Sequence, residues 1–183
     1  MRRPLPCLIA LLALLAATAL AGCGDDDDDE PAVRTSEQQS ETTEEPSPSA
    51  QREALKDTST KPVIPKPSGA PPRKLEKEDI VKGKGPPAEA GNTLTVNYVG
   101  VAFSTGDEFD ASWDTGQPFP VPLGAGQVIE GWDKGLVGMR KGGRRILTIP
   151  PELAYGTEGY PPTIAPNETL VFVVDALEIT PGP

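Results

Sequence analysis

All nine aromatic residues of this 183-residue chain lie between positions 98 and 172. Aromatic side chains contribute much of the buried area of a core, so the packed part of the chain must be sought there. The chain has no His and only two Cys, which excludes His-based catalysis, a disulfide framework and a Cys-rich zinc site. Its formal charge of -10 also excludes a general nucleic-acid binder.

The first 23 residues have the pattern of an export signal. Arg2 and Arg3 precede an uncharged stretch, residues 8–20, which as a helix is about 20 Å long and too short for a hydrocarbon core of about 30 Å. The stretch ends in Leu20-Ala21-Gly22-Cys23, which is similar to a bacterial lipobox. We therefore expect a lipoprotein signal peptide over residues 1–22 and lipidation of Cys23.

Lipidation at Cys23 would hold the mature protein outside the cytoplasm, anchored to the bacterial cell membrane. An ordinary cleavable signal with an incidental Cys23 is the alternative. The twin-arginine route is disfavoured because Arg2-Arg3 lacks the rest of that motif.

Residues 23–73 are predicted to be the acylated Cys and a disordered, acidic and Pro-rich linker. Residues 24–73 contain 6 basic and 12 acidic residues and no aromatic residue, so they bury too little apolar surface to offset the entropy lost on ordering. The run Asp25–Asp29 lacks the Gly and the spacing of a calcium-binding loop and is interpreted as part of a solvated spacer.

Residues 74–183 are predicted to form the folded domain. Leu94, Val96 and Tyr98 alternate with less apolar residues, as in a half-buried strand, and residues 145–149 and 170–179 are further apolar, β-branched runs. Residues 119–123 are predicted to form an edge strand or a bulged strand, because Pro120 and Pro122 cannot donate to a partner.

Only one segment of this domain has helical spacing. Ile129, Trp132, Leu136 and Val137 recur at helical intervals between Gly126 and Gly138. Internal glycines weaken such a helix by about 1 kcal/mol each, so tertiary packing must hold it. Several strands and one short helix predict an α+β fold with a mainly antiparallel sheet wrapped around that helix.

Seven short blocks then resemble one known family in their order and spacing. They are Val96-Asn97-Tyr98-Val99-Gly100, Phe109-Asp110-Ala111-Ser112, Gln117-Pro118-Phe119, Val128-Ile129-Glu130-Gly131-Trp132, Gly138-Met139-Arg140-Lys141-Gly142-Gly143, Ala154-Tyr155-Gly156 and Thr169-Leu170-Val171-Phe172. The blocks resemble the FKBP-type peptidyl-prolyl isomerases, and the resemblance covers essentially all of residues 74–180. It implies an antiparallel sheet of five or six strands around one short helix, and rotation about X-Pro bonds without any cofactor or metal.

The resemblance also implies roles for individual residues. The catalytic set would be Tyr98, Phe109, Asp110, Trp132, Tyr155 and Phe172, with the proline ring on the indole of Trp132. The substrate-binding set would be Phe119, Val128, Ile129, Tyr160 and Ile164. The Ile129 N–H and the Tyr155 hydroxyl would donate to substrate carbonyls, Asp110 would bias the electrostatics of the twisted amide, and Tyr160 and Ile164 would form the outer rim. Phe103 is interpreted as a core residue.

Three positions depart from the best-known members of that family. Thr115 stands where an Arg often pairs with the pocket Asp, and Tyr160 and Thr163 replace a frequent His and a frequent aliphatic rim residue. A Thr hydroxyl can still hydrogen-bond to Asp110. The basic residues Arg140, Lys141, Arg144 and Arg145 are interpreted as a charged hairpin turn rather than a nucleic-acid site.

The expected partners are Pro-containing polypeptides, the membrane through the lipid anchor, and ligands of the rapamycin and tacrolimus type, but no nucleic acid. The protein is expected to be a monomer that assists the folding of exported proteins. A module that binds Pro-containing segments without turnover is the main alternative. A small-solute-binding lipoprotein is disfavoured because about 110 residues do not build a two-lobed cleft.

Overall fold

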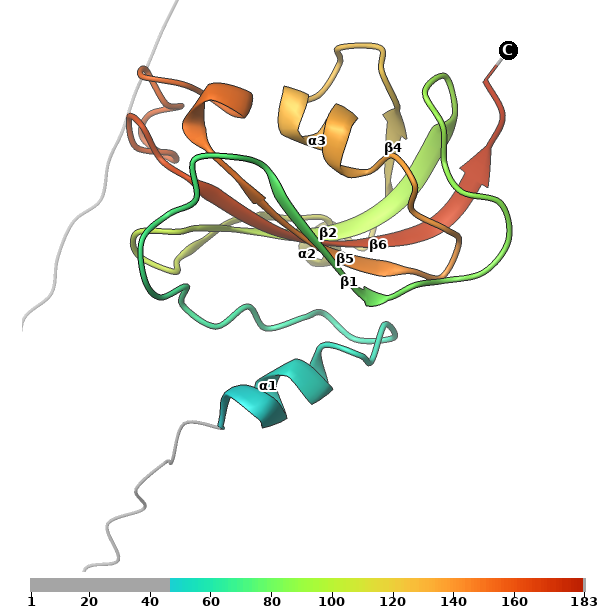
Figure 1. The fold of residues 1–183 in the computed structure, drawn as a ribbon, viewed down its shortest axis with the longest axis horizontal. Coiled ribbons are helices and arrows are strands. Elements are labelled where there is room, and N and C mark those ends of the chain that lie inside the picture. The colour runs from blue at the N-terminus through green and yellow to red at the C-terminus, as the bar shows by residue number, and fades with distance from the viewer. Residues whose placement is uncertain (1–46, 183) are drawn as a thin grey trace, which may run out of the picture. The chain divides into compact units, whose positions relative to one another are not determined.

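The computed structural model describes residues 47–182, so the predicted signal peptide and Cys23 lie outside the described residues. Its centre is a six-stranded antiparallel sheet with the order β1-β5-β6-β2-β3, in which β4 also pairs with β2 (Figure 1). The strands are β1 (Glu76–Val81), β2 (Thr93–Ala102), β3 (Glu108–Ala111), β4 (Phe119–Pro122), β5 (Arg144–Ile149) and β6 (Leu170–Thr180). The helices are α1 (Pro48–Ala54), α2 (Ser112–Thr115), α3 (Glu130–Gly135) and the 3-10 turn Pro151–Leu153.

Strands β2 and β6 form the middle of the sheet and are paired from Thr93 and Thr180 to Ala102 and Leu170. Strands β4 and β3 pair with successive parts of the other side of β2, residues 93–96 and 99–101. In the described residues β4 pairs with β2 alone, which agrees with the predicted edge position of its two prolines. The α+β fold and its antiparallel sheet are thereby confirmed.

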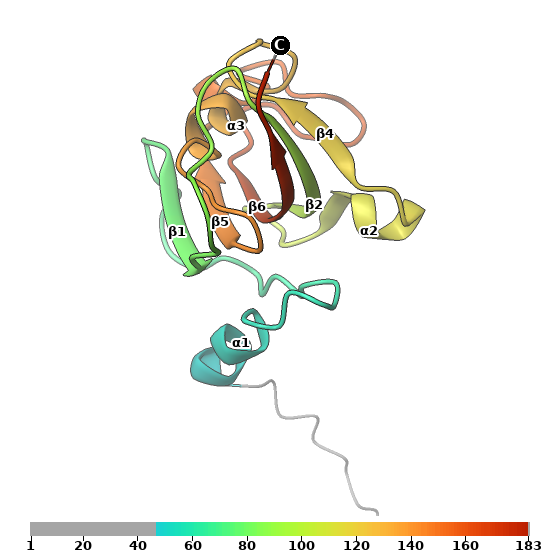
Figure 2. The same ribbon diagram turned by 90° about the vertical axis from the view of Figure 1, so that its right-hand side faces the viewer.

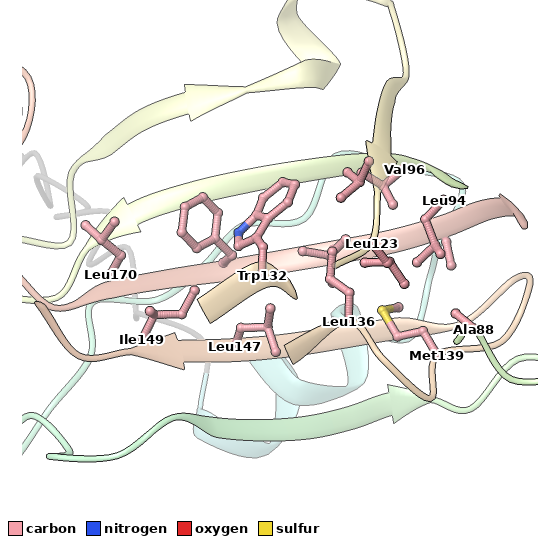
Figure 3. Packing of buried hydrophobic residues seen from close by; sticks show 14 of the residues in the cluster. Ala88, Leu94, Val96, Leu123, Trp132, Leu136, Met139, Leu147, Ile149 and Leu170 are labelled. Atoms are coloured by element: carbon pink, nitrogen blue, oxygen red, sulfur yellow. The ribbon is translucent and has the colours of Figure 1, made fainter. Parts of the chain in front are cut away.

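Helix α3 lies directly on one face of the sheet, where the main hydrophobic core is packed (Figure 3). A Cβ at Gly131 would lie 2.3 Å from Ile149 Cγ2, and a Cβ at Gly135 would lie 2.8 Å from Leu147 Cδ2. These glycines therefore weaken the isolated helix but allow its backbone to approach β5. The predicted helix is confirmed, although it ends at Gly135 and leaves Val137 outside it and 37% exposed.

The side chains of the first two residues of β5 lie on opposite faces of the sheet. Arg144 and Arg145 are 0% and 5% exposed, so their interpretation as part of a charged turn is wrong. Arg145 points to the α3 face, where its Nη1 donates to the carbonyl oxygens of Gly135 (2.6 Å) and Val137 (3.0 Å). A cation at this position stabilises the carboxyl end of the helix.

The opposite face is covered by residues 55–72, which we call the strap, and α1 lies on the far side of the strap from the sheet (Figure 2). Ile64 of the strap packs against a second cluster, whose buried members are Val99, Val101, Ala111 and Val171. The structure therefore departs from the prediction of a disordered linker to residue 73. Composition alone is a poor guide here, because the strap is ordered by contacts with a sheet face that its own sequence does not reveal.

Arg144 connects the strap to the sheet. Its guanidinium donates to both carboxylate oxygens of Asp175 (2.5 and 2.7 Å) and to the carbonyl oxygens of Leu55 (3.1 Å), Asp57 (2.8 Å) and Thr60 (3.1 Å). Burial raises the pKa of Asp175 above its ordinary value, against the opposing effect of Arg144. The desolvated carboxylate therefore depends on its only cation within the described residues.

Replacing Arg144 with Met should lower the free energy of unfolding by about 3–5 kcal/mol, because it leaves a buried carboxylate without a cation. The exposed neighbour Lys141 provides a control, and Lys141→Met should change stability by no more than about 0.5 kcal/mol. Urea unfolding at neutral pH measures both. Adding Asp175→Val to Arg144→Met should restore part of the stability. Equal stability of Arg144→Met and Lys141→Met would contradict the role given to Arg144.

Candidate active site

Five aromatic rings from β2, β3, β4, α3 and β6 meet on the α3 face, and we call them the aromatic cluster: Tyr98, Phe109, Phe119, Trp132 and Phe172. Trp132 lies at its centre, with ring centroids 5.1 Å from Tyr98, 5.2 Å from Phe172 and 6.4 Å from Phe119, in edge-to-face arrangements. Trp132 and Phe172 are each 5% exposed, whereas Phe119 is 41% exposed. The cluster is therefore buried at its base and open to solvent at its edge.

One carboxylate lies beside the aromatic cluster. Asp110 of β3 is exposed, and its Oδ2 accepts a hydrogen bond of 2.6 Å from the Tyr98 hydroxyl. Burial, followed by this hydrogen bond, raises the pKa of Tyr98 above its ordinary value. The tyrosine therefore remains a donor at neutral and mildly alkaline pH and holds the carboxylate at the rim of the cluster.

Thr115 does not take the place of the absent Arg. Its hydroxyl donates to the carbonyl oxygen of Ser112 (2.9 Å) and so closes the short helix α2. The sequence allowed Thr115 to bind the Asp110 carboxylate, but in the structure Tyr98 makes that contact. Orientation of Asp110 thus depends on β2 rather than on α2.

Ser112 was not singled out from the sequence, although it connects β2 to the segment after Asp110. Its Oγ accepts from the Tyr98 N–H (2.9 Å) and donates to Asn97 Oδ1 (3.2 Å). The residue belongs to a block that carried the family resemblance, but nothing in its spacing indicated that it binds the strand bearing Tyr98.

Gly100 of β2 is a second residue that sequence reasoning missed. A Cβ there would lie 2.7 Å from both Phe109 Cζ and Phe172 Cε1, whose rings meet edge to face with centroids 5.5 Å apart. Glycine in the middle of a long strand is the available signal for such a close approach. Gly100 therefore allows the two rings to occupy the space above the strand.

Two further expected site residues lie where α3 begins. Ile129 is the residue that precedes the helix, and Val128 and Ile129 both pack half-buried against the main core. The first N–H groups of a helix have no partner within it. Within residues 47–182 the Ile129 N–H makes no backbone hydrogen bond, so it is available to an acceptor beside Trp132.

The loop before β6 supplies the remaining expected residues. Tyr155 is 39% exposed, and its ring centroid lies 5.8 Å from that of Tyr160, which is 63% exposed. Burial and the nearby Asp110 carboxylate raise the pKa of Tyr155, which keeps this hydroxyl a donor as well. Ile164 is buried in the main core and is joined to Tyr160 by two backbone hydrogen bonds of 2.9 Å.

The structure thus places Val128, Ile129 and Ile164 in the main core with the aromatic cluster, and Tyr160 beside Tyr155 and Ile164. Phe103 lies apart from them, in the cluster on the opposite face, as its interpretation as a core residue requires. Among the residues that the structure describes, no group of three or more metal-ligating side chains is found.

Replacing Gly100 with Ala should displace the Phe109 ring and lower the free energy of unfolding by about 1–3 kcal/mol, as overpacking does. The aromatic proton chemical shifts of Phe109 and Phe172 report the displacement. Gly135→Ala, which crowds Leu147 instead, should leave those shifts in place even if it destabilises the protein. Unchanged chemical shifts of Phe109 in Gly100→Ala would show that the Phe109 ring does not need the space left by the missing Cβ of Gly100.

Comparison with known proteins agrees with this geometry. Residues 85–177 match the model of the family described as FKBP-type peptidyl-prolyl cis-trans isomerase. An FK506-binding protein of Streptomyces anulatus is 57% identical over 120 residues, which cover 65% of this chain and 97% of the relative. A probable FK506-binding protein of Corynebacterium glutamicum is 49% identical over 117 residues, 64% of this chain and 97% of the relative.

The crystal structure of AtFKBP13 superimposes with a TM-score of 0.53 at 38% identity, covering 57% of this chain and 91% of that one. A match that covers 120 of 183 residues must begin at or before residue 64, so the match with the Streptomyces relative extends into the strap. The aromatic cluster, the Tyr98–Asp110 pair and these matches lead to one conclusion: the chain belongs to the FKBP-type peptidyl-prolyl cis-trans isomerase family.

Proposed function

We propose that this protein catalyses rotation about X-Pro peptide bonds in exported proteins, at the outer side of the membrane to which it is anchored. The observation that carries the catalytic part is the buried indole of Trp132, surrounded by aromatic rings and flanked by the Asp110 carboxylate. The anchoring part is supported by the lipobox-like run before Cys23.

Aromatic side chains suit this reaction because of the nature of its barrier. Amide resonance makes rotation cost about 18–20 kcal/mol, and the uncatalysed X-Pro isomerisation takes tens to hundreds of seconds. The twisted transition state has lost conjugation and is less dipolar than the planar amide. An apolar surface therefore binds it better, relative to water, than it binds the ground state, and such differential binding lowers the barrier.

Each residue of the site has a role in this proposal. The proline ring stacks on Trp132, with Tyr98, Phe109, Phe119, Val128, Ile129 and Phe172 around it. The Ile129 N–H and the Tyr155 hydroxyl donate to substrate carbonyls on either side of the rotating bond. Asp110, held by Tyr98, acts on the charge distribution of the twisted amide, and Tyr160 and Ile164 contact the residue before proline.

The same surface should bind ligands of the FK506 and rapamycin type. Two relatives carry FK506 binding in their names, and their matches with this chain span 97% of each relative. A ligand that covers Trp132 would compete with the proline ring, so we expect such compounds to inhibit isomerisation.

Membrane attachment is compatible with access to the site. The described chain begins with α1 on the side of the sheet opposite to α3, whereas the aromatic cluster lies on the α3 face (Figures 1 and 2). The described residues are thus joined to the preceding part of the chain on the side away from the aromatic cluster. No helix among the described residues is long and apolar enough to span a bilayer.

Tyr155→Phe should lower kcat/KM about threefold to tenfold, the loss of one hydrogen bond, and Asp110→Leu about tenfold or more, the loss of a charged group. Both side chains are exposed, so the fold should be retained. Trp132→Ala should lower both activity and stability, the latter by about 3–5 kcal/mol. A protease-coupled cis/trans assay on a Leu-Pro or Phe-Pro peptide, with urea unfolding alongside, measures these effects.

Asp107→Leu is a matched control for Asp110→Leu, because Asp107 is an exposed acid three residues earlier in the chain. It should retain full activity. A wild-type protein that binds the peptide without accelerating isomerisation would instead be a binding module and would refute the catalytic proposal. Wild-type rates in Asp110→Leu and Tyr155→Phe would refute the roles of these residues.

Replacing Cys23 with Ser should abolish lipid attachment and release the protein from the membrane fraction. Metabolic labelling with palmitate and fractionation of the cells measure the two effects. Cys7→Ser, within the predicted signal peptide, is the control and should leave both unchanged. Labelling that persists in Cys23→Ser would contradict the anchor.

A further inference from the structure

The strap places one cation against the segment that carries Phe109 and Asp110. Lys61 Nζ lies 2.7 Å from Glu108 Oε1 in β3 and 2.6 Å from Asp114 Oδ1 in α2. These two acids lie on either side of Phe109 and Asp110 in the sequence. A single ammonium group therefore joins both ends of the segment that forms one side of the active site.

This segment repels itself electrostatically. Residues 107–114 contain four carboxylates, Asp107, Glu108, Asp110 and Asp114, and no Lys or Arg. Within residues 47–182 these acids form two ion pairs, and both are with Lys61. Thr115, next to the segment, is uncharged and bonds to a backbone carbonyl. The charge that opposes the repulsion therefore comes from outside the segment.

The strap holds Lys61 in place before it meets the two acids. Its neighbour Thr60 is fixed through its carbonyl oxygen to the buried guanidinium of Arg144, and Ile64 packs in the cluster that contains Ala111. Anchors on both sides of Lys61 reduce the conformational entropy that its two ion pairs would otherwise cost.

The titration of the groups is consistent with a strong local interaction. Hydrogen bonds to Asp114 and Glu108 raise the pKa of Lys61, and the hydrogen bond from Lys61 lowers the pKa of Asp114. Lys61 and Asp114 are therefore charged throughout the neutral range. The Lys61, Glu108 and Asp114 side chains are 35%, 36% and 59% exposed, so salt must screen the pairs.

We propose that Lys61 is a positioning residue for isomerisation: from the strap it holds β3 and α2 so that Phe109 and Asp110 keep their places beside Trp132. The residue lies outside residues 85–177, which match the family model. The proposal rests on the catalytic function proposed above, and it adds the strap to the parts of the chain on which the activity depends.

The test compares three variants of the full chain at low ionic strength. Lys61→Met keeps an unbranched side chain one atom shorter and removes its charge, and should lower kcat/KM about threefold to tenfold. Lys61→Arg retains the charge and should stay within about twofold of wild type. Lys66→Met removes the same charge from the same strap, at a residue with no ion pair among those described, and should leave kcat/KM unchanged.

The salt dependence separates positioning from a general loss of structure. The screening length falls from about 10 Å at 0.1 M to about 3 Å at 1 M salt. The rate ratio of wild type to Lys61→Met should therefore approach one as NaCl is raised to 1 M. A general packing defect would leave this ratio unchanged. Melting temperatures, measured in the same buffers, should show that all variants remain folded.

Backbone amide NMR gives a readout that does not depend on catalysis. In Lys61→Met the amides of residues 108–114 should broaden or exchange faster at low salt, whereas those of β5 should not. An inactive wild type with this NMR response would refute the proposed function but not the link from Lys61 to β3. If the wild type is active, any of three results would overturn the present proposal. Lys61→Met could have the wild-type kcat/KM at low salt, Lys66→Met could lose as much activity as Lys61→Met, or the loss of activity in Lys61→Met could persist in 1 M NaCl.

Discussion

The close packing of α3 against β5 determines where the site can form. Gly131 and Gly135 have no room for a methyl group, because Ile149 and Leu147 occupy the space in which a Cβ would lie. This short distance lets Trp132, between the two glycines, reach the centre of the sheet and meet Tyr98 and Phe172 edge to face. If the helix packed further from β5, the Trp132 indole would not reach Tyr98 and Phe172, and the buried part of the aromatic cluster would not form.

One face of the sheet packs against α3 and the other against the strap, and two consecutive side chains of β5 contact these two elements. Side chains alternate between faces along a strand, so Arg145 reaches the end of α3 while Arg144 reaches the strap. Both guanidinium groups donate to backbone carbonyl oxygens. The buried charges thus tie a short helix and an extended segment to the sheet, neither of which would be stable by itself.

Much of the fold could be predicted from the sequence because the strongest signals are periodic. The alternation around Leu94 and Val96 and the apolar run of β6 identify the two central strands, and the prolines of β4 identify an edge. The aromatic residues of the site were found through short blocks that resemble a family. Gly100 and Ser112 stood in those blocks without a visible role, because the rings and N–H group that they contact come from other strands or become close only on folding.

The sequence by itself determined the class of fold, the family, the membership of the aromatic cluster and the expectation of a lipid anchor at Cys23. Those conclusions depend on local pattern and residue type, which can be identified from the sequence without knowing which residues are in contact. Only the tertiary structure decided that the strap packs on the sheet, that Arg144 and Arg145 are buried, and that Tyr98 rather than Thr115 binds Asp110. Each of these joins residues distant in sequence, and such contacts depend on which groups the folded chain brings within hydrogen-bonding distance.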